Sequence, residues 1–305
     1  MNDNPYYAPG MPEDDTLDHI VRATALDGHV KALAIRTTGA VREAARIHGT
    51  SSAATAALGR FITGSLLLAD NMKNPDDSQT TILRCDGPLG GMTCVCDSSC
   101  HAKAYANNPD VPTSYIRPGK INVAEAVGKG TLTVIRDIGL REPYVGSVEL
   151  VSGEIAEDFT YYLAASEQTP SVVALGVLME GGEVKHAGGM MIQLMPGASE
   201  EDITYIEERV NGGFPEITFL LEEGFSPAKI LDLFIGNRDL VYLSGRPAAF
   251  KCNCSREKMS AGLAALGKAD LEELIASGEP VQTECHFCGA KYVFETDEIR
   301  EMLKK

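Results

Sequence analysis

The chain has 305 residues, of which 44% are hydrophobic, and it carries a formal net charge of −16 at pH 7. Two domains joined by a connecting region are expected, because this length exceeds what a single hydrophobic core usually supports. The acidic balance, with a sequence pI of about 4.8, argues against a nucleic-acid partner, since phosphate binding requires a basic surface.

Residues 1–15 hold several Pro and Gly residues among acidic ones and are expected to form a flexible extension. They lack the basic start and apolar run of a secretory signal. Apolar runs along the chain stay shorter than the roughly 18 residues that cross a bilayer, and the longest candidate lies at 172–179. A cytoplasmic location and no membrane partner are therefore predicted.

Residues 16–197 are predicted to form a strand-rich N-terminal domain with packed helices, of the α+β class. Asp27 and Gly28 divide two apolar segments, which indicates a hairpin, and Gly49 ends a short helix. A hydroxyl residue at 50–52 can cap a long helix that continues to Met72. The strands are expected at 20–26, 30–35, 81–85, 92–96, 102–106, 131–136, 146–151, 171–179 and 187–194, and the helices at 40–47, 54–72 and 154–166.

Residues 198–249 are predicted to form a metastable helical linker. Ser199 and the acids after it favour a helix start, because a hydroxyl accepts backbone N–H groups and acids complement the helix dipole. Three short helical runs, at 200–210, 215–223 and 227–234, are separated by Gly and Pro residues. Isolated short helices are marginal in water, so this segment depends on docking for its stability and can serve as a switch.

The last predicted domain, residues 250–305, contains two cysteine doublets. Cys252 and Cys254 form a CxC, and Cys285 and Cys288 form a CxxC. Two close pairs of thiolates from distant parts of the chain can surround one metal, and ligation by sulfur alone favours Zn²⁺. The alternatives are four ordinary buried cysteines or two metal-free thiol pairs. A domain of this size has a small core, so its folding is expected to depend on the metal.

A second cysteine cluster consists of Cys85, Cys94, Cys96 and Cys100, with His101 beside it. It can be a further metal or thiol-switch site, or its members can act as small buried hydrophobic residues in a sheet. The second interpretation is preferred, because free cysteine commonly has that role. His286 lies inside the CxxC, but four sulfurs already complete a tetrahedral shell, so it is interpreted as a neighbour of the site.

Two motifs carry a resemblance to a known family. They are Cys252-Asn253-Cys254-Ser255-Arg256-Glu257 and Cys285-His286-Phe287-Cys288 followed by Tyr292 and Phe294. Supporting matches are Ala57-Leu58-Gly59-Arg60, Asp86-Gly87-Pro88-Leu89-Gly90, Gly128-Lys129-Gly130-Thr131-Leu132, Ser166-Glu167-Gln168 and Gln193-Leu194-Met195-Pro196. From about residue 16 to its end, the chain resembles the redox-regulated holdase chaperones of bacteria known as heat shock protein 33.

The resemblance implies a chaperone that is not an enzyme and needs no nucleotide. The reduced form would hold one Zn²⁺ through Cys252, Cys254, Cys285 and Cys288 and be inactive. Oxidation would pair Cys252 with Cys254 and Cys285 with Cys288, release the metal, and unfold the C-terminal region and the linker. The exposed apolar surface would bind unfolding client proteins and prevent their aggregation, and the active form would be a homodimer.

Two other functions remain as alternatives. One is a zinc-ribbon interaction module that engages nucleic acid. Residues 252–305 contain seven Lys and Arg but ten Asp and Glu, and this acidic balance opposes binding to phosphates. The other is a thiol-disulfide oxidoreductase acting through Cys285 and Cys288. A catalytic CxxC normally opens a helix within a βαβ setting and keeps an unmetallated thiolate, which this sequence does not indicate.

Overall fold

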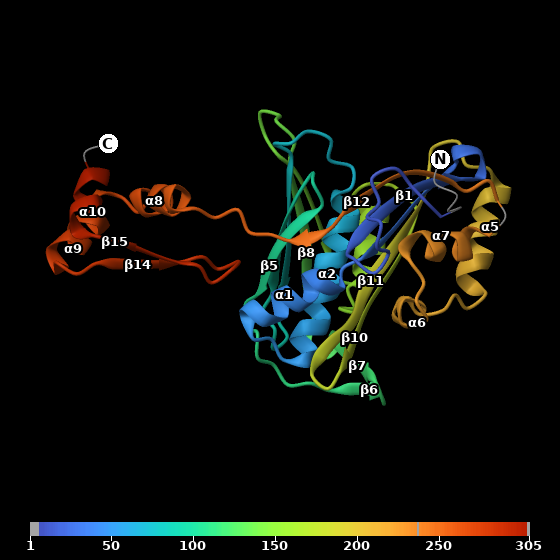
Figure 1. Ribbon diagram of the computed structural model, residues 1–305, viewed down its shortest axis with the longest axis horizontal. Coiled ribbons are helices and arrows are strands. Elements are labelled where there is room, and N and C mark those ends of the chain that lie inside the picture. Colours follow the sequence, from blue (N-terminus) through green and yellow to red (C-terminus); the bar gives the residue numbers. More distant parts are fainter. Residues whose placement is uncertain (1–5, 237, 304–305) are drawn as a thin grey trace. The chain divides into compact units, whose positions relative to one another are not determined.

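The computed structural model describes residues 6–236 and 238–303. The chain divides into two compact units, Met1–Phe250 and Lys251–Lys305. Both units mix helices with antiparallel strands (Figure 1), so the predicted α+β class is confirmed. The segment predicted as a linker, residues 198–249, lies within the first unit.

The first sheet has five strands in the order β10-β11-β2-β1-β12. Alternate residues of a strand face opposite sides, so this sheet has two apolar surfaces. Ile20, Leu33 and Ile35 face one core, while Val21 and Ala34 face another. The predicted hairpin of β1 and β2 is confirmed. The strand bounds are β1 (His19–Ala25), β2 (Val30–Arg36), β10 (Ser171–Glu180), β11 (Glu183–Leu194) and β12 (Val241–Pro247).

The second sheet has six strands in the order β13-β5-β4-β3-β8-β9, and it contains the predicted meander. Its strands are β3 (Ser78–Cys85), β4 (Met92–Asp97), β5 (His101–Ala106), β8 (Gly130–Asp137), β9 (Tyr144–Glu149) and β13 (Ala249–Phe250). The sequence did not predict β13, the hairpin of β6 (Tyr115–Arg117) and β7 (Lys120–Ile121), or the helix α3 (Val123–Val127). These elements are too short to show a periodicity.

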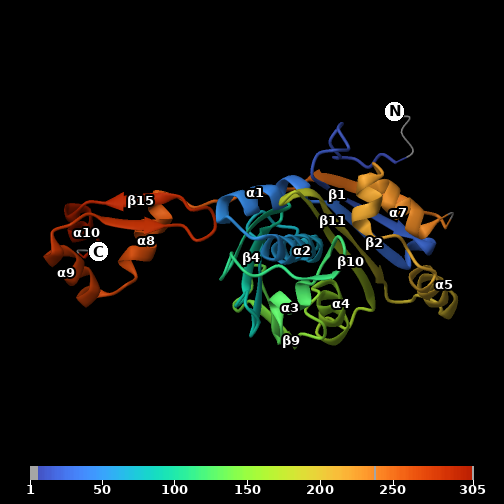
Figure 2. The same ribbon diagram turned by 90° about the horizontal axis from the view of Figure 1, so that it is seen from below.

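The helix α2 (Ser52–Ala69) lies between the two sheets (Figure 2), and the Ser51 hydroxyl accepts the N–H of Ala54 as its cap. By length and hydropathy this helix could cross a membrane, which corrects the expectation that no segment would reach that threshold. Its many Ala, Thr, Ser and Gly residues interrupt the strongly apolar ones, so no continuous apolar run is seen in the sequence. Of its 18-residue window 89% is buried, as is usual for the core helix of a globular domain. Also in this domain are α1 (Thr38–His48), ended by Gly49, and α4 (Ala156–Ala165).

Three helices cover the outer surface of the first sheet: α5 (Glu200–Asn211), α6 (Ile217–Glu222) and α7 (Pro227–Ile235). Figure 2 shows α7 on the side of β1 and β2 that faces away from α2. The sheet residues that these helices cover are here called the linker-facing surface and include Val21, Ala23, Ala32, Ala34, Met190 and Ile192. The helices contribute Ile206, Ile217, Leu220, Leu221, Ile230, Leu231 and Phe234 to the same core.

Polar contacts also hold the helices to the sheet. Lys185 of β11 forms an ion pair with Glu222 of α6 at 2.8 Å, and Arg36 of β2 donates to the carbonyl oxygen of Phe225 at 3.2 Å. The hydroxyl of Tyr242 donates to the carbonyl oxygen of Ala228 at 2.9 Å. All three helices predicted for the linker are present, and in this structure they are docked.

The end of the predicted linker is not helical. Residues 241–247 form β12, which pairs with β1 and places Gly245 opposite Val21. A strand of this kind depends on a partner more than two hundred residues away, so the local pattern does not indicate it. At the other end of the chain, residues 1–5 of the predicted extension lie outside the described residues, while Ala8 and Met11 are buried.

The second unit contains helices and one antiparallel pair of strands. The helices are α8 (Arg256–Ala264), α9 (Lys268–Ser277) and α10 (Thr296–Met302), and β14 (Val281–Glu284) pairs with β15 (Lys291–Phe294). Its core centres on the buried side chains of Leu263, Leu271, Phe294 and Ile299. So small a core supplies little apolar burial, and a unit built on it needs additional stabilisation.

Candidate metal centre

The four cysteines of the two doublets converge in the second unit. Their sulfur atoms all lie within 4.8 Å of one another. Two of the separations join the doublets, at 3.7 Å between the sulfurs of Cys252 and Cys285 and 3.4 Å between those of Cys254 and Cys288. Cys285 is buried, and the other three are partly exposed.

Local structure positions each doublet. Cys252 and Cys254 lie just before α8, whose first turn is capped by the Ser255 hydroxyl. The second doublet occupies the turn between β14 and β15, where Cys285 donates its N–H to the carbonyl oxygen of Ala290 at 2.9 Å. Gly289 adopts a φ of 68° there and donates its N–H to the Cys285 carbonyl oxygen. That left-handed conformation suits glycine.

The spacing of the sulfurs fits a four-coordinate metal. A tetrahedron with metal–sulfur bonds of about 2.3 Å has edges of about 3.8 Å, close to the separations of 3.7 Å and 3.4 Å between the doublets. Among the residues that the structure describes, no other set of three or more His, Cys, Asp or Glu side chains comes this close together. His286 is not in the set.

Tyr292 of β15 completes the surroundings of the sulfurs. Its hydroxyl oxygen lies at hydrogen-bond distance from the sulfur of Cys254, 3.2 Å away. Partial burial opposes ionisation of Cys254, yet the hydrogen bonds from Tyr292 and the neighbouring thiols lower its pKa to about 7. Burial and the nearby sulfurs raise the pKa of Cys288 to about 12, and the contact with Cys254 raises the pKa of Tyr292 to about 12. The cluster therefore stabilises negative charge unevenly, and the pKa of Cys254 lies below those of Cys252 and Cys288.

Arg256 links the first doublet to the core of the second unit. Its guanidinium lies 4.5 Å from the centre of the Phe294 ring and forms an ion pair with Glu298 of α10 at 2.7 Å. Sequence reasoning quoted Arg256 and Phe294 only as parts of motifs and did not predict their contact. A hairpin that leads into Phe294 and a helix that starts at Arg256 therefore approach each other at the metal centre.

The second cysteine cluster is part of the main core. Cys94, Cys96 and Cys100 are buried among apolar side chains, and Cys85 packs against them with partial exposure. The sulfurs of Cys94 and Cys96 lie 3.7 Å apart on one face of β4, where alternate residues point the same way. Burial raises the pKa of Cys100 to about 12. The preferred prediction, small buried hydrophobic residues, is confirmed for these three.

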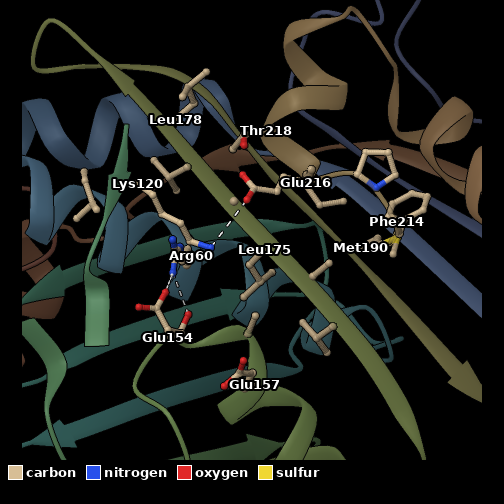
Figure 3. A pocket seen from close by; sticks show the side chains of 18 of the residues that line it. Arg60, Lys120, Glu154, Glu157, Leu175, Leu178, Met190, Phe214, Glu216 and Thr218 are labelled. Carbon is tan, nitrogen blue, oxygen red and sulfur yellow. Dashed lines mark hydrogen bonds and ion pairs between the residues drawn. The ribbon is translucent and has the colours of Figure 1, made fainter. Parts of the chain in front are cut away.

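A cavity of about 920 Å³ lies where β10 faces the segment that leads into α6. Figure 3 shows Leu175 and Leu178 of β10 on one side, with Phe214 and Glu216 on the other. Glu216 forms ion pairs with Arg117 at 3.0 Å and Lys120 at 3.8 Å. The wall between the cavity and solvent thus includes the linker itself.

Comparison with known proteins gives the family. The family model described as Hsp33 protein matches residues 18–295. The chain belongs to the Hsp33 family. It is 44% identical over 288 residues to the 33 kDa chaperonin of Ruminiclostridium cellulolyticum, covering 94% of this chain and 98% of that protein. It is 45% identical over 289 residues to the 33 kDa chaperonin of Clostridioides difficile, covering 94% and 99%.

A solved structure agrees with the fold. The crystal structure of the 33 kDa chaperonin (heat shock protein 33 homolog) of Thermotoga maritima matches with a TM-score of 0.84 and 34% sequence identity, over 94% of this chain and 98% of that one. The resemblance found in the sequence is confirmed. Membership of this family makes the chain a chaperone that binds client proteins and not an enzyme.

Proposed function

We propose that this chain is a redox-regulated, ATP-independent holdase whose reduced form holds one Zn²⁺ through Cys252, Cys254, Cys285 and Cys288 and is inactive. The observation that carries the proposal is the convergence of four sulfurs within 4.8 Å in a unit with a very small core. A bound Zn²⁺ would supply cross-links between the two doublets and, with them, much of the folding free energy of that unit. The four sulfurs would bind it as thiolates.

Oxidation would turn these ligands into disulfides. A peroxide or hypochlorite takes two electrons from each pair of thiolates and one S–S bond forms, while the oxidant takes up protons from solvent and leaves as water, or as chloride and water. A disulfide sulfur carries no negative charge, so the unit loses its metal. The pairing carried over from the family is Cys252 with Cys254 and Cys285 with Cys288. Because sulfurs of different doublets also lie within 3.4–3.7 Å of each other, peptide mapping of the oxidised protein tests this pairing.

Loss of the metal would release the linker. Cys252 follows Phe250 of β13 by two residues, so the second unit continues directly along the chain from residues 198–249. After it unfolds, that end of the linker would be held by the pairing of β12 with β1 and of β13 with β5. The helices α5, α6 and α7 are too short to persist without docking. Their departure would uncover the linker-facing surface and widen the cavity beside β10, leaving contiguous apolar areas of the kind that bind unfolded chains.

The same proposal covers the partners and location. The clients would be unfolding proteins held without nucleotide, and the active form would be a homodimer in the cytoplasm. The net charge of −16 supports the expectation that neither nucleic acid nor an anionic membrane surface is a partner.

The test uses one set of samples. Reduced protein is titrated with hypochlorite, and zinc release, thiol loss and suppression of a client's aggregation are followed together. Coincident changes are expected, with one zinc released and four thiols lost per chain. Zinc release without any aggregation suppression would overturn the holdase function, and catalytic turnover of substrate disulfides would favour an oxidoreductase. Against the latter, Cys285 and Cys288 lie in a turn between two strands and not at the start of a helix.

A further inference from the structure

Residues 6–11, here called the N-terminal strap, lie against β12. The family match begins at residue 18, so the strap is outside it. The carbonyl oxygen of Pro9 accepts the N–H of Gly245 at 2.7 Å, and the Met11 sulfur accepts the N–H of Ala8 at 3.1 Å. Because β12 is an edge strand of its sheet, the strap satisfies a backbone donor that the edge leaves without a strand partner.

The contact is close and partly apolar. A Cβ atom on Gly10, whose φ is +88°, would lie 2.3 Å from the Gly245 carbonyl oxygen, and a Cβ atom on Gly245 would lie 2.3 Å from Cγ of Met11. Ala8 and Met11 are 0% and 8% exposed and belong to the core formed by the linker helices and the first sheet. Only glycine at both positions allows this approach of the two backbones.

The strap reaches the linker helices as well. The Lys229 ammonium of α7 lies 5.7 Å from the centre of the Tyr6 ring, a cation–π contact, and Tyr6 packs against the same core. The strap therefore contacts the helical part of the linker at Lys229 and its final strand at Gly245. Both parts have to separate from the sheet when the linker is released.

We propose that the N-terminal strap is an autoinhibitory clasp that holds β12 and α7 in the docked state and slows their release. This proposal rests on the proposed release of the linker. The strap adds a barrier to linker release. Its residues 6–11 contain no cysteine and lie far in the sequence from Cys252, Cys254, Cys285 and Cys288. The strap would thus determine the rate at which the linker is released, while oxidation of the metal centre determines whether release begins.

The test compares two glycines in the reduced, zinc-loaded full chain. Gly10→Ala introduces both strain and a clash with β12. Gly182→Ala is the matched control, because Gly182 has a φ of +86° and nothing within 4 Å of a Cβ position. Hydrogen exchange of residues 241–247 is expected to accelerate roughly tenfold in Gly10→Ala, as loss of about 1.4 kcal/mol of docking would give, and to stay at the wild-type rate in Gly182→Ala. Met11→Ala is expected to act like Gly10→Ala, because it removes both the buried side chain and the sulfur that accepts the Ala8 N–H.

The half-time of activation by hypochlorite should shorten by a similar factor in Gly10→Ala and Met11→Ala. Unchanged exchange in both variants, equal acceleration in Gly182→Ala, or faster exchange without faster activation would each overturn the clasp. If the oxidised wild type never suppresses aggregation, the proposed function fails by itself. Exchange in the reduced protein then still decides whether the strap holds β12.

Discussion

The substitution Phe234→Ala should release the linker helices from the first sheet while the four cysteines of the metal centre stay unchanged. Phe234 of α7 is 0% exposed, and its ring meets that of Phe214 edge-on, with centroids 5.1 Å apart. Phe219 of α6 provides a matched control, because it is the same residue type in the same linker and is 53% exposed. Replacing a buried Phe by Ala typically costs about 3–5 kcal/mol, whereas an exposed substitution usually stays within about 0.5 kcal/mol.

These magnitudes predict a large shift between docked and released linker. Each 1.4 kcal/mol changes the ratio tenfold, so a loss of about 3 kcal/mol favours release by roughly a hundredfold. Phe234→Ala should therefore suppress client aggregation at far lower oxidant than the wild type, and in part while still reduced. Phe219→Ala should need as much oxidant as the wild type.

The assay combines aggregation suppression, zinc content and hydrogen exchange of residues 198–249 in the reduced proteins. The expected result for Phe234→Ala is one zinc per chain, fast exchange in the linker and measurable holdase activity. If the linker exchanges fast and the zinc is retained but no activity appears in either redox state, linker release is not what exposes the client-binding surface. If exchange of the linker matches the wild type, the docking energy inferred from burial is wrong.

Three further predictions concern the metal, the second cysteine cluster and pH. Removing the metal from reduced protein with a chelator should abolish exchange protection in residues 251–305 and accelerate exchange in the linker, residues 198–249, but leave β2, β10 and β11 protected, because these three strands belong to neither the second unit nor the linker. The substitutions Cys94→Ala, Cys96→Ala and Cys100→Ala should each cost on the order of 1 kcal/mol of stability and leave one zinc per chain, whereas a second zinc in the wild type would contradict their role as core residues. Burial lowers the pKa of His19 in the folded domain, so the unfolded chain takes up the proton first as pH falls. The contribution of His19 to the free energy of unfolding should therefore be complete above about pH 6.5 and decrease below it. Urea titrations of His19→Gln should show a shallower decrease over that range.

Much of the metal centre could be predicted from the sequence, because ligand chemistry and spacing are local properties. Two thiol doublets in a segment of this length indicate one sulfur-only site wherever the chain carries them. The helix starts near residues 50–52 and at Ser199 could also be predicted, since a cap acts within one turn of its helix. Around the sulfurs, however, the hydroxyl of Tyr292 and the stacking of Arg256 on Phe294 depend on side-chain packing and were not predicted.

The sequence by itself therefore determined the order and type of the longer elements, the α+β class, and the cysteines that meet at the metal centre. Only the tertiary structure decided where the helical part of the linker ends, which surface of the first sheet its helices cover, and which contacts keep them docked. The strand β12 exists because β1 offers a partner in register, and Met11 is buried because Gly245 leaves room for it. Such long-range contacts depend on two distant segments at once, so neither segment's own pattern of residues reveals them.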